Sequence, residues 1–162
     1  LEQAEENIEW LNEQGFNPSV IHAYQSAMLG FKIGLSPAKA PFLGPKSVSH
    51  AKKAMELDDK NPLGYIQYGN SQFYMPAIFG GSKEKAIEYY EKALQLHEQN
   101  PGQTLYEWHH LSLMVQIAQS YEELKMYEKA KNIYIGILQK EPEFLWVKDE
   151  LYPELLKKMK LE

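Results

Sequence analysis

The sequence predicts an all-α protein built from repeated pairs of helices, and three observations support this prediction. Apolar residues recur at spacings of three and four through most of the chain, which is typical of amphipathic helices. The alternating pattern of a β-strand is essentially missing. Prolines that follow asparagine at positions 18, 62 and 101 lie about 40 residues apart, the length of a two-helix repeat.

The helix boundaries follow from caps and breakers. Asn17-Pro18 and Asn61-Pro62 each open a helix, because asparagine caps the first free N–H groups and proline fits the first turn. Ser82 caps a further helix, and the residue before Pro142 ends another. The expected helices span residues 1–14, 18–33, 45–57, 62–74, 83–98, 111–123, 128–140 and 143–160, the last bent at Pro153.

These helices group into a single helical-repeat domain, residues 1–162. Its expected parts are a helix of a truncated first unit (1–15), three helix pairs (17–59, 61–100 and 104–142) and a capping helix (143–162). The chain starts with Leu1 inside a helix, so we interpret it as a trimmed or mature fragment.

Residues 114–142 resemble the tetratricopeptide (TPR) repeat, and residues 65–93 resemble it within each helix. The matching positions are Met114, Ile117, Ala118, Tyr121, Ala130, Tyr134 and Pro142 in one copy, and Tyr65, Tyr68, Gly69, Ala86, Tyr90 and Ala93 in the other. Residues 21–54 match least, since Gln25 stands where a small residue is expected. The resemblance implies an α-α superhelix, a TPR solenoid of about three helix pairs.

The same resemblance implies a concave groove lined by the first helix of each pair. The positions that it nominates for binding a partner are His22, Ser26, Leu29, Leu63, Ile66, Asn70, Phe73, Ser112, Val115, Gln119 and Glu122. Asn70 falls where peptide-binding TPR proteins hold ligand backbone with an amide. Val115, Ile66 and Gln119 replace the basic residues of a carboxylate clamp, so the groove favours an extended peptide or a partner helix.

Two long loops occupy equivalent places in consecutive units. Residues 35–45 and 75–82 both combine proline, glycine and a phenylalanine. Phe42 and Phe79 are candidate anchors for a partner, and the alternative is that they plug the gaps between helix pairs. Residues 75–82 also resemble the Pro-x-x-Phe-Gly-Gly loop of exported bacterial TPR proteins, such as the TPR subunits that accompany TRAP transporters, which favours an exported or periplasmic location over a cytoplasmic one.

Composition and motifs argue against several other classes of protein. The net charge of −5 with interspersed signs argues against binding nucleic acid, and no apolar run is long enough to span a membrane. The chain has no cysteine, and His109 and His110 point about 100° apart on a helix, so neither a catalytic site nor a metal or cofactor is expected. We therefore expect a non-catalytic protein-interaction module, and the alternative is a transporter accessory that encloses a small apolar ligand.

Overall fold

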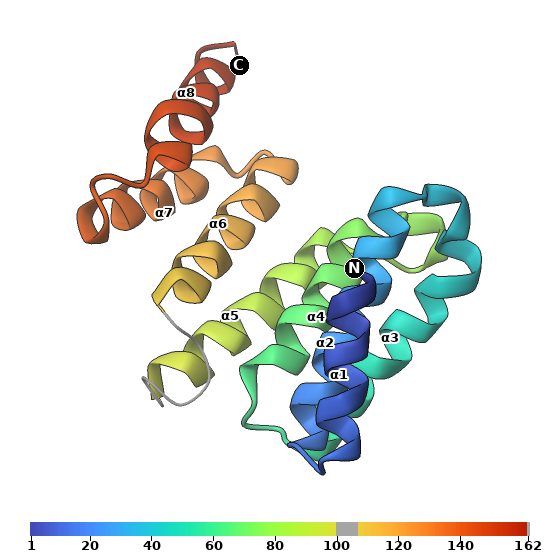
Figure 1. Ribbon diagram of the computed structural model, residues 1–162. Coiled ribbons are helices and arrows are strands. Elements are labelled where there is room, and N and C mark those ends of the chain that lie inside the picture. The colour runs from blue at the N-terminus through green and yellow to red at the C-terminus, as the bar shows by residue number, and fades with distance from the viewer. Residues whose placement is uncertain (100–106, 162) are drawn as a thin grey trace. The chain divides into compact units, whose positions relative to one another are not determined.

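The computed structural model describes residues 1–99 and 107–161, and every regular element in this part of the chain is helical (Figure 1). The all-α prediction is therefore confirmed. The chain divides into two compact units, Leu1–Thr104 and Leu105–Glu162.

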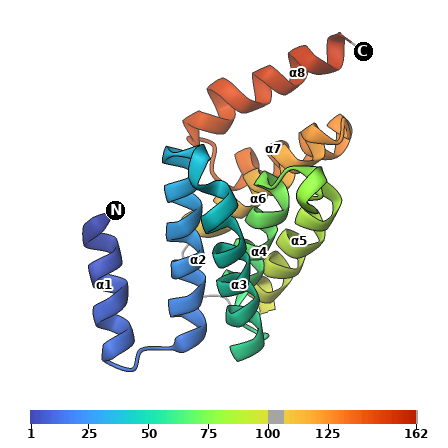
Figure 2. The same cartoon turned by 90° about the vertical axis from the view of Figure 1, so that its right-hand side faces the viewer.

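The first unit is a layered stack of helices joined by short connections. α2 packs against α3, α4 packs against α5, and α2 and α3 each contact α4, while α1 lies beside α2 (Figure 2). The elements are α1 (Glu2–Glu13), α2 (Pro18–Leu35), the 3-10 turn η1 (Pro37–Lys39), α3 (Ala40–Leu57), α4 (Pro62–Tyr74), the 3-10 turn η2 (Ala77–Phe79) and α5 (Lys83–Gln99).

The asparagine caps explain where two of these helices begin. The Asn17 side chain accepts hydrogen bonds from the N–H groups of Ser19 and Val20, at 3.0 and 3.4 Å. Asn61 does the same for Leu63 at 3.1 Å and is itself buried. Both caps satisfy helix N–H groups that have no partner within the helix.

The start of α3 differs from the prediction. The helix begins at Ala40 rather than at Pro45, so the long loop expected at residues 35–45 is mostly η1 and the first turns of α3. Pro45 therefore lies inside the helix, where it cannot donate to the carbonyl of Pro41. Both prolines are exposed, so water can satisfy that carbonyl and the helix continues.

The second unit contains α6 (Glu107–Glu123), α7 (Tyr127–Lys140), the π-helical turn η3 (Trp146–Leu151) and α8 (Tyr152–Lys160). The expected C-terminal helix is thus divided into a π-helical turn and an α-helix. Pro153 lies in the first turn of α8, where the missing N–H removes no α-helical hydrogen bond. The core of this unit is formed by Val115, Ala118, Ala130, Tyr134, Ile137, Val147 and Leu155, so η3 and α8 cover the α6–α7 pair.

Candidate functional site

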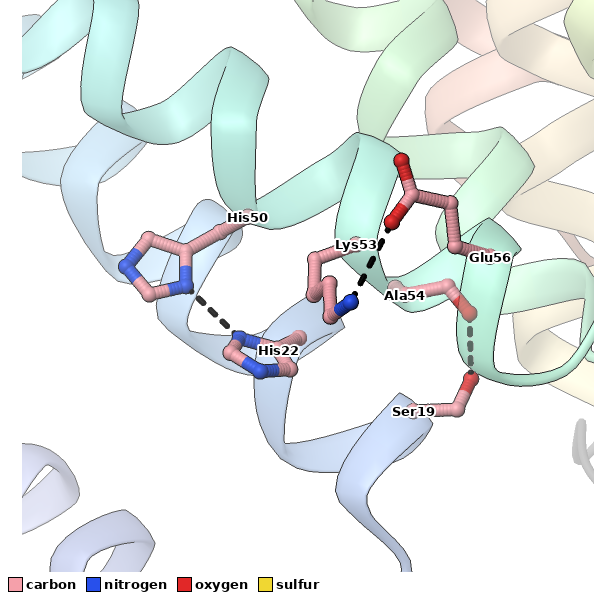
Figure 3. A network of polar contacts seen from close by, with 6 residues as sticks. All are labelled: Ser19, His22, His50, Lys53, Ala54 and Glu56. Atoms are coloured by element: carbon pink, nitrogen blue, oxygen red, sulfur yellow. Dashed lines mark hydrogen bonds and ion pairs between the residues drawn. The ribbon is translucent and has the colours of Figure 1, made fainter.

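Polar contacts join residues 19–26 of α2 to residues 47–54 of α3, and two of the predicted groove residues take part in them. At one end, the Ser19 hydroxyl donates to the carbonyl of Ala54 at 2.9 Å (Figure 3). Further along, Ser26 donates to the carbonyl of Ser47 at 2.9 Å, and Ser47 donates back to the carbonyl of Ser26 at 3.0 Å. Ser26 is buried in this interface and offers little surface to a partner.

Between these serine contacts lies a pair of histidines. The Nδ1 atoms of His22 and His50 are 2.8 Å apart, so one of them carries the proton and donates it to the other (Figure 3). Burial lowers the pKa of His50, and the neighbouring His22 lowers it further. One turn along, Lys53 binds Glu56 at 3.3 Å. The side chain of His22 is therefore directed towards α3, which the sequence did not indicate.

The amide of Asn70, on α4, is engaged within the first unit. Its Oδ1 accepts a hydrogen bond from the hydroxyl of Tyr90 on α5 at 2.8 Å, and its Nδ2 donates to Gln67 at 3.3 Å. Tyr90 is fully buried, and burial raises its pKa. The hydrogen bond to Asn70 satisfies a polar group that would otherwise be costly to bury.

Glu122, on α6, has an equivalent role in the second unit. One carboxylate oxygen accepts a hydrogen bond from the hydroxyl of buried Tyr134 at 2.6 Å, and the other accepts one from Lys158 at 2.8 Å. Burial, followed by the contact with Glu122, raises the pKa of Tyr134. The hydrogen bond to Glu122 also raises the pKa of Lys158, so this lysine stays charged. Both oxygens of Glu122 therefore hold the second unit together.

The remaining groove positions separate by their exposure. Leu63, Phe73 and Val115 are buried and belong to the packing of their units. Four positions stay half-buried with part of the side chain in solvent: Leu29, Ile66, Ser112 and Gln119. Their role in binding a partner remains a prediction. They are the predicted positions whose side chains a partner can reach.

The two loop phenylalanines are both open to solvent. Phe42 lies in the first turn of α3 and Phe79 at the end of η2, with 76% and 70% of their surfaces exposed. Neither side chain plugs a gap between helices in this structure.

No cluster of three or more histidine or acidic side chains that could hold a metal lies within residues 1–99 and 107–161. A shallow hollow in the second unit lies beside the turn between α6 and α7 and is lined in part by Met126, Tyr127 and Met159. None of the helices described is both long enough and apolar enough to cross a bilayer.

Comparison with known proteins supports the repeat assignment. The family model of the tetratricopeptide repeat matches residues 78–100 and 111–139. The first match covers α5, and the second covers most of α6 and α7. They contain Tyr90 and Tyr134, the two buried tyrosines whose hydroxyls bind the preceding helices.

Among solved structures, the chain is similar to the HusA haemophore from Porphyromonas gingivalis, with a TM-score of 0.66 and 24% sequence identity. The match covers 75% of this chain and 62% of that chain, so the chain spans less than two thirds of the haemophore. At this identity the likeness concerns the fold. No curated protein sequence matches the chain.

Proposed function

We propose that this TPR protein is a non-catalytic interaction module that binds an extended peptide or a partner helix on the exposed faces of its first helices. Tetratricopeptide repeats serve in general as protein-interaction modules, which supports this class of function. The finer assignment of the binding face is the proposal.

The observation that carries the proposal is that the side chain of Gln119 is half-exposed and its amide has no hydrogen-bond partner in the described part of the chain. Counted from the small residues Gly69 and Ala118, this glutamine occupies the repeat position that Asn70 occupies in the preceding pair. The side-chain amide of Asn70 is bonded to Tyr90, whereas the side chain of Gln119 is half-exposed and makes no hydrogen bond within the described part of the chain. A free amide both donates and accepts, as the backbone of an extended peptide requires.

A photo-crosslinking experiment tests which face meets a partner. A photoreactive phenylalanine analogue is placed at Gln119 or Ile66, and lysate from the source cells is irradiated with each variant. The matched controls carry the same analogue at Lys92 on α5 or Asn132 on α7, both exposed on second helices. We expect crosslinks to a defined partner from the first-helix positions and none from the controls.

Affinity measurements on the captured partner then test the chemistry. Gln119→Glu keeps the shape and the acceptor but loses the donor, so we expect it to weaken binding about tenfold, the cost of about one unmade hydrogen bond. Gln119→Ala is expected to weaken binding at least as much. Equal crosslinking at all four positions, or unchanged affinity of both variants, would refute the assignment of this face.

A second candidate function is the binding of a small apolar ligand, and the fold likeness to a haemophore favours it. Haemin is the first ligand to test, because its absorbance changes when a protein side chain ligates the iron. A saturable change that His22→Ala and His50→Ala both reduce would support this function. A titration that does not saturate would eliminate haemin as the ligand.

A further inference from the structure

One end of the first unit exposes an unusual number of large apolar side chains. α2 runs antiparallel to α3, and α4 runs antiparallel to α5, so the α2–α3 and α4–α5 connections lie at the same end of the unit (Figures 1 and 2). We call this end the apolar tip. Its exposed side chains, between 62% and 86% accessible, are Phe31, Leu35, Phe42, Tyr74, Ile78 and Phe79.

The backbone of the α4–α5 connection fixes the positions of Ile78 and Phe79 in the tip. Gly80 has a φ of 94°, which disfavours any side chain, and a Cβ on Gly81 would lie 1.9 Å from the carbonyl oxygen of Met75. The N–H of Gly81 also donates to the carbonyl of Pro76 at 3.3 Å, and the next N–H, that of Ser82, bonds back to α4. These backbone constraints hold the loop in a conformation in which Ile78 and Phe79 face solvent.

The charge around the tip differs from that of the whole chain. The chain carries a net charge of −5, yet no aspartate or glutamate occurs in residues 14–55 or 60–83. Lys39 and Lys46 lie beside the tip, both exposed and without an ion-pair partner in the described residues. Lys32 is neutralised by Glu5 of α1, and Lys83 donates to the carbonyl of Phe73.

We propose that the apolar tip docks this protein on an anionic lipid surface. Aromatic and aliphatic side chains partition into the boundary between headgroups and acyl chains, where phenylalanine and tyrosine are favoured. The ammonium groups of Lys39 and Lys46 then face the headgroup phosphates, and each lysine near such a surface strengthens binding by about fivefold. The acidic remainder of the chain opposes this little, because salt screens charges beyond about 10 Å.

A lipid surface fits the tip better than an apolar protein partner. An apolar protein partner has no need of unpaired lysines beside the tip, whereas an anionic membrane attracts Lys39 and Lys46. The exposed side chains also come from several elements at one end of the unit, namely the ends of α2, α3 and α4 and the turn η2. That arrangement presents several apolar groups towards a broad surface rather than one groove for a peptide.

Co-sedimentation with vesicles tests the proposal on the full chain. The vesicles are made of phosphatidylcholine alone, or of phosphatidylcholine and phosphatidylglycerol in equal amounts. We expect binding to the mixed vesicles that weakens as salt is added, and little binding to phosphatidylcholine alone. Absence of binding to the mixed vesicles at low salt, or equal binding to both kinds, would overturn the proposal.

Two sets of variants separate the contributions of apolar contact and charge. Phe42→Ser/Ile78→Ser/Phe79→Ser is expected to reduce binding by more than about tenfold. Lys39→Gln/Lys46→Gln is expected to reduce binding by about 25-fold on mixed vesicles only. The matched controls, which should bind like the wild type, are Phe16→Ser/Leu57→Ser at the opposite end of the unit and Lys60→Gln/Lys92→Gln away from the tip. Equal losses in the controls would overturn the assignment of the tip.

A labelled single cysteine reports where the protein meets the lipid. The chain has no cysteine, so Phe79→Cys and Leu57→Cys each give one site for an environment-sensitive dye. We expect mixed vesicles to shift the emission of the dye at residue 79 and leave that at residue 57 unchanged. An unchanged emission at residue 79, with a protein captured from lysate that the tip variants lose, would instead assign the tip to a protein partner and refute the lipid proposal.

Discussion

Replacing Gly69 with alanine tests whether α4 and α5 are held together as closely as the repeat requires. A Cβ on Gly69 would lie 2.5 Å from Cε1 and 2.7 Å from Cδ1 of Tyr90, far inside the usual carbon–carbon contact of about 3.5 Å. The ring is fully buried and its hydroxyl is bonded to Asn70, so it has no free direction in which to move. Overpacking costs about 1–3 kcal/mol, and alanine recovers about 1 kcal/mol of helix propensity. We expect the free energy of unfolding to fall by up to about 2 kcal/mol.

Gly30→Ala is the matched control, because it makes the same chemical change in the interior of α2. A Cβ at Gly30 meets no atom within 4 Å, so only helix propensity acts and we expect a gain of about 1 kcal/mol. Urea unfolding followed by circular dichroism measures both variants. In a Tyr90→Leu background the cost of Gly69→Ala should shrink, since the clashing ring is gone. If Gly69→Ala stabilised the protein as Gly30→Ala does, the close approach of the two helices would be disproved.

The remaining predictions concern capping and pH. Asn61→Ala removes the cap of α4 and should lower the free energy of unfolding by about 1–2 kcal/mol in the same urea experiment; an unchanged value would contradict the capping role. Because the pKa values of Tyr90 and Tyr134 are raised, the folded state keeps these protons after the unfolded chain releases them, and stability should fall as pH rises above 10.0. Tyr90→Phe/Tyr134→Phe should flatten that alkaline loss, and an equally steep loss would refute the cause. The pKa of His50 is lowered, so the unfolded chain binds this proton first and stability should fall as pH drops through 6.5. His50→Gln should reduce the difference between urea midpoints measured on either side of that pH.

The sequence predicted the helices well where a boundary depends on one residue's own chemistry. Asn17 and Asn61 cap α2 and α4 as expected, because a capping side chain bonds to N–H groups only two or three residues away. The start of α3 was placed five residues too late, since Pro45 suggested a helix start. A helix can continue past Pro45 only if water reaches the carbonyl of Pro41, which has lost its N–H partner. The local sequence pattern does not reveal that exposure.

The candidate site was harder to predict because it depends on how each helix is rotated about its axis. Repeat offsets placed His22 and Ser26 on an open face, yet both are directed towards α3. The partner of His22 is His50, which is 28 residues away and carries no motif of its own. Only the packing of α2 against α3 brings the two rings together, and this part of the chain matches the repeat pattern least.

The two repeats satisfy their buried tyrosines in different ways, and this difference bears on where a ligand can bind. The hydroxyl of Tyr90 donates to the amide oxygen of Asn70, one of the predicted groove residues. Tyr134 uses Glu122 instead. The amide of Gln119, which occupies the position of Asn70 in its own repeat, is therefore not needed by the fold.

The acceptor for the Tyr134 hydroxyl is a glutamate rather than an amide, and this has a structural consequence. A carboxylate that accepts one hydrogen bond from a buried tyrosine is left with a charge to compensate, and Lys158 from α8 supplies the cation. Glu122 thus also binds α8 to the α6–α7 pair, and its side chain is only 9% exposed. Because Glu122 binds both the Tyr134 hydroxyl and Lys158, the side-chain amide of Gln119 is left for the role that we propose for it, binding the backbone of a peptide.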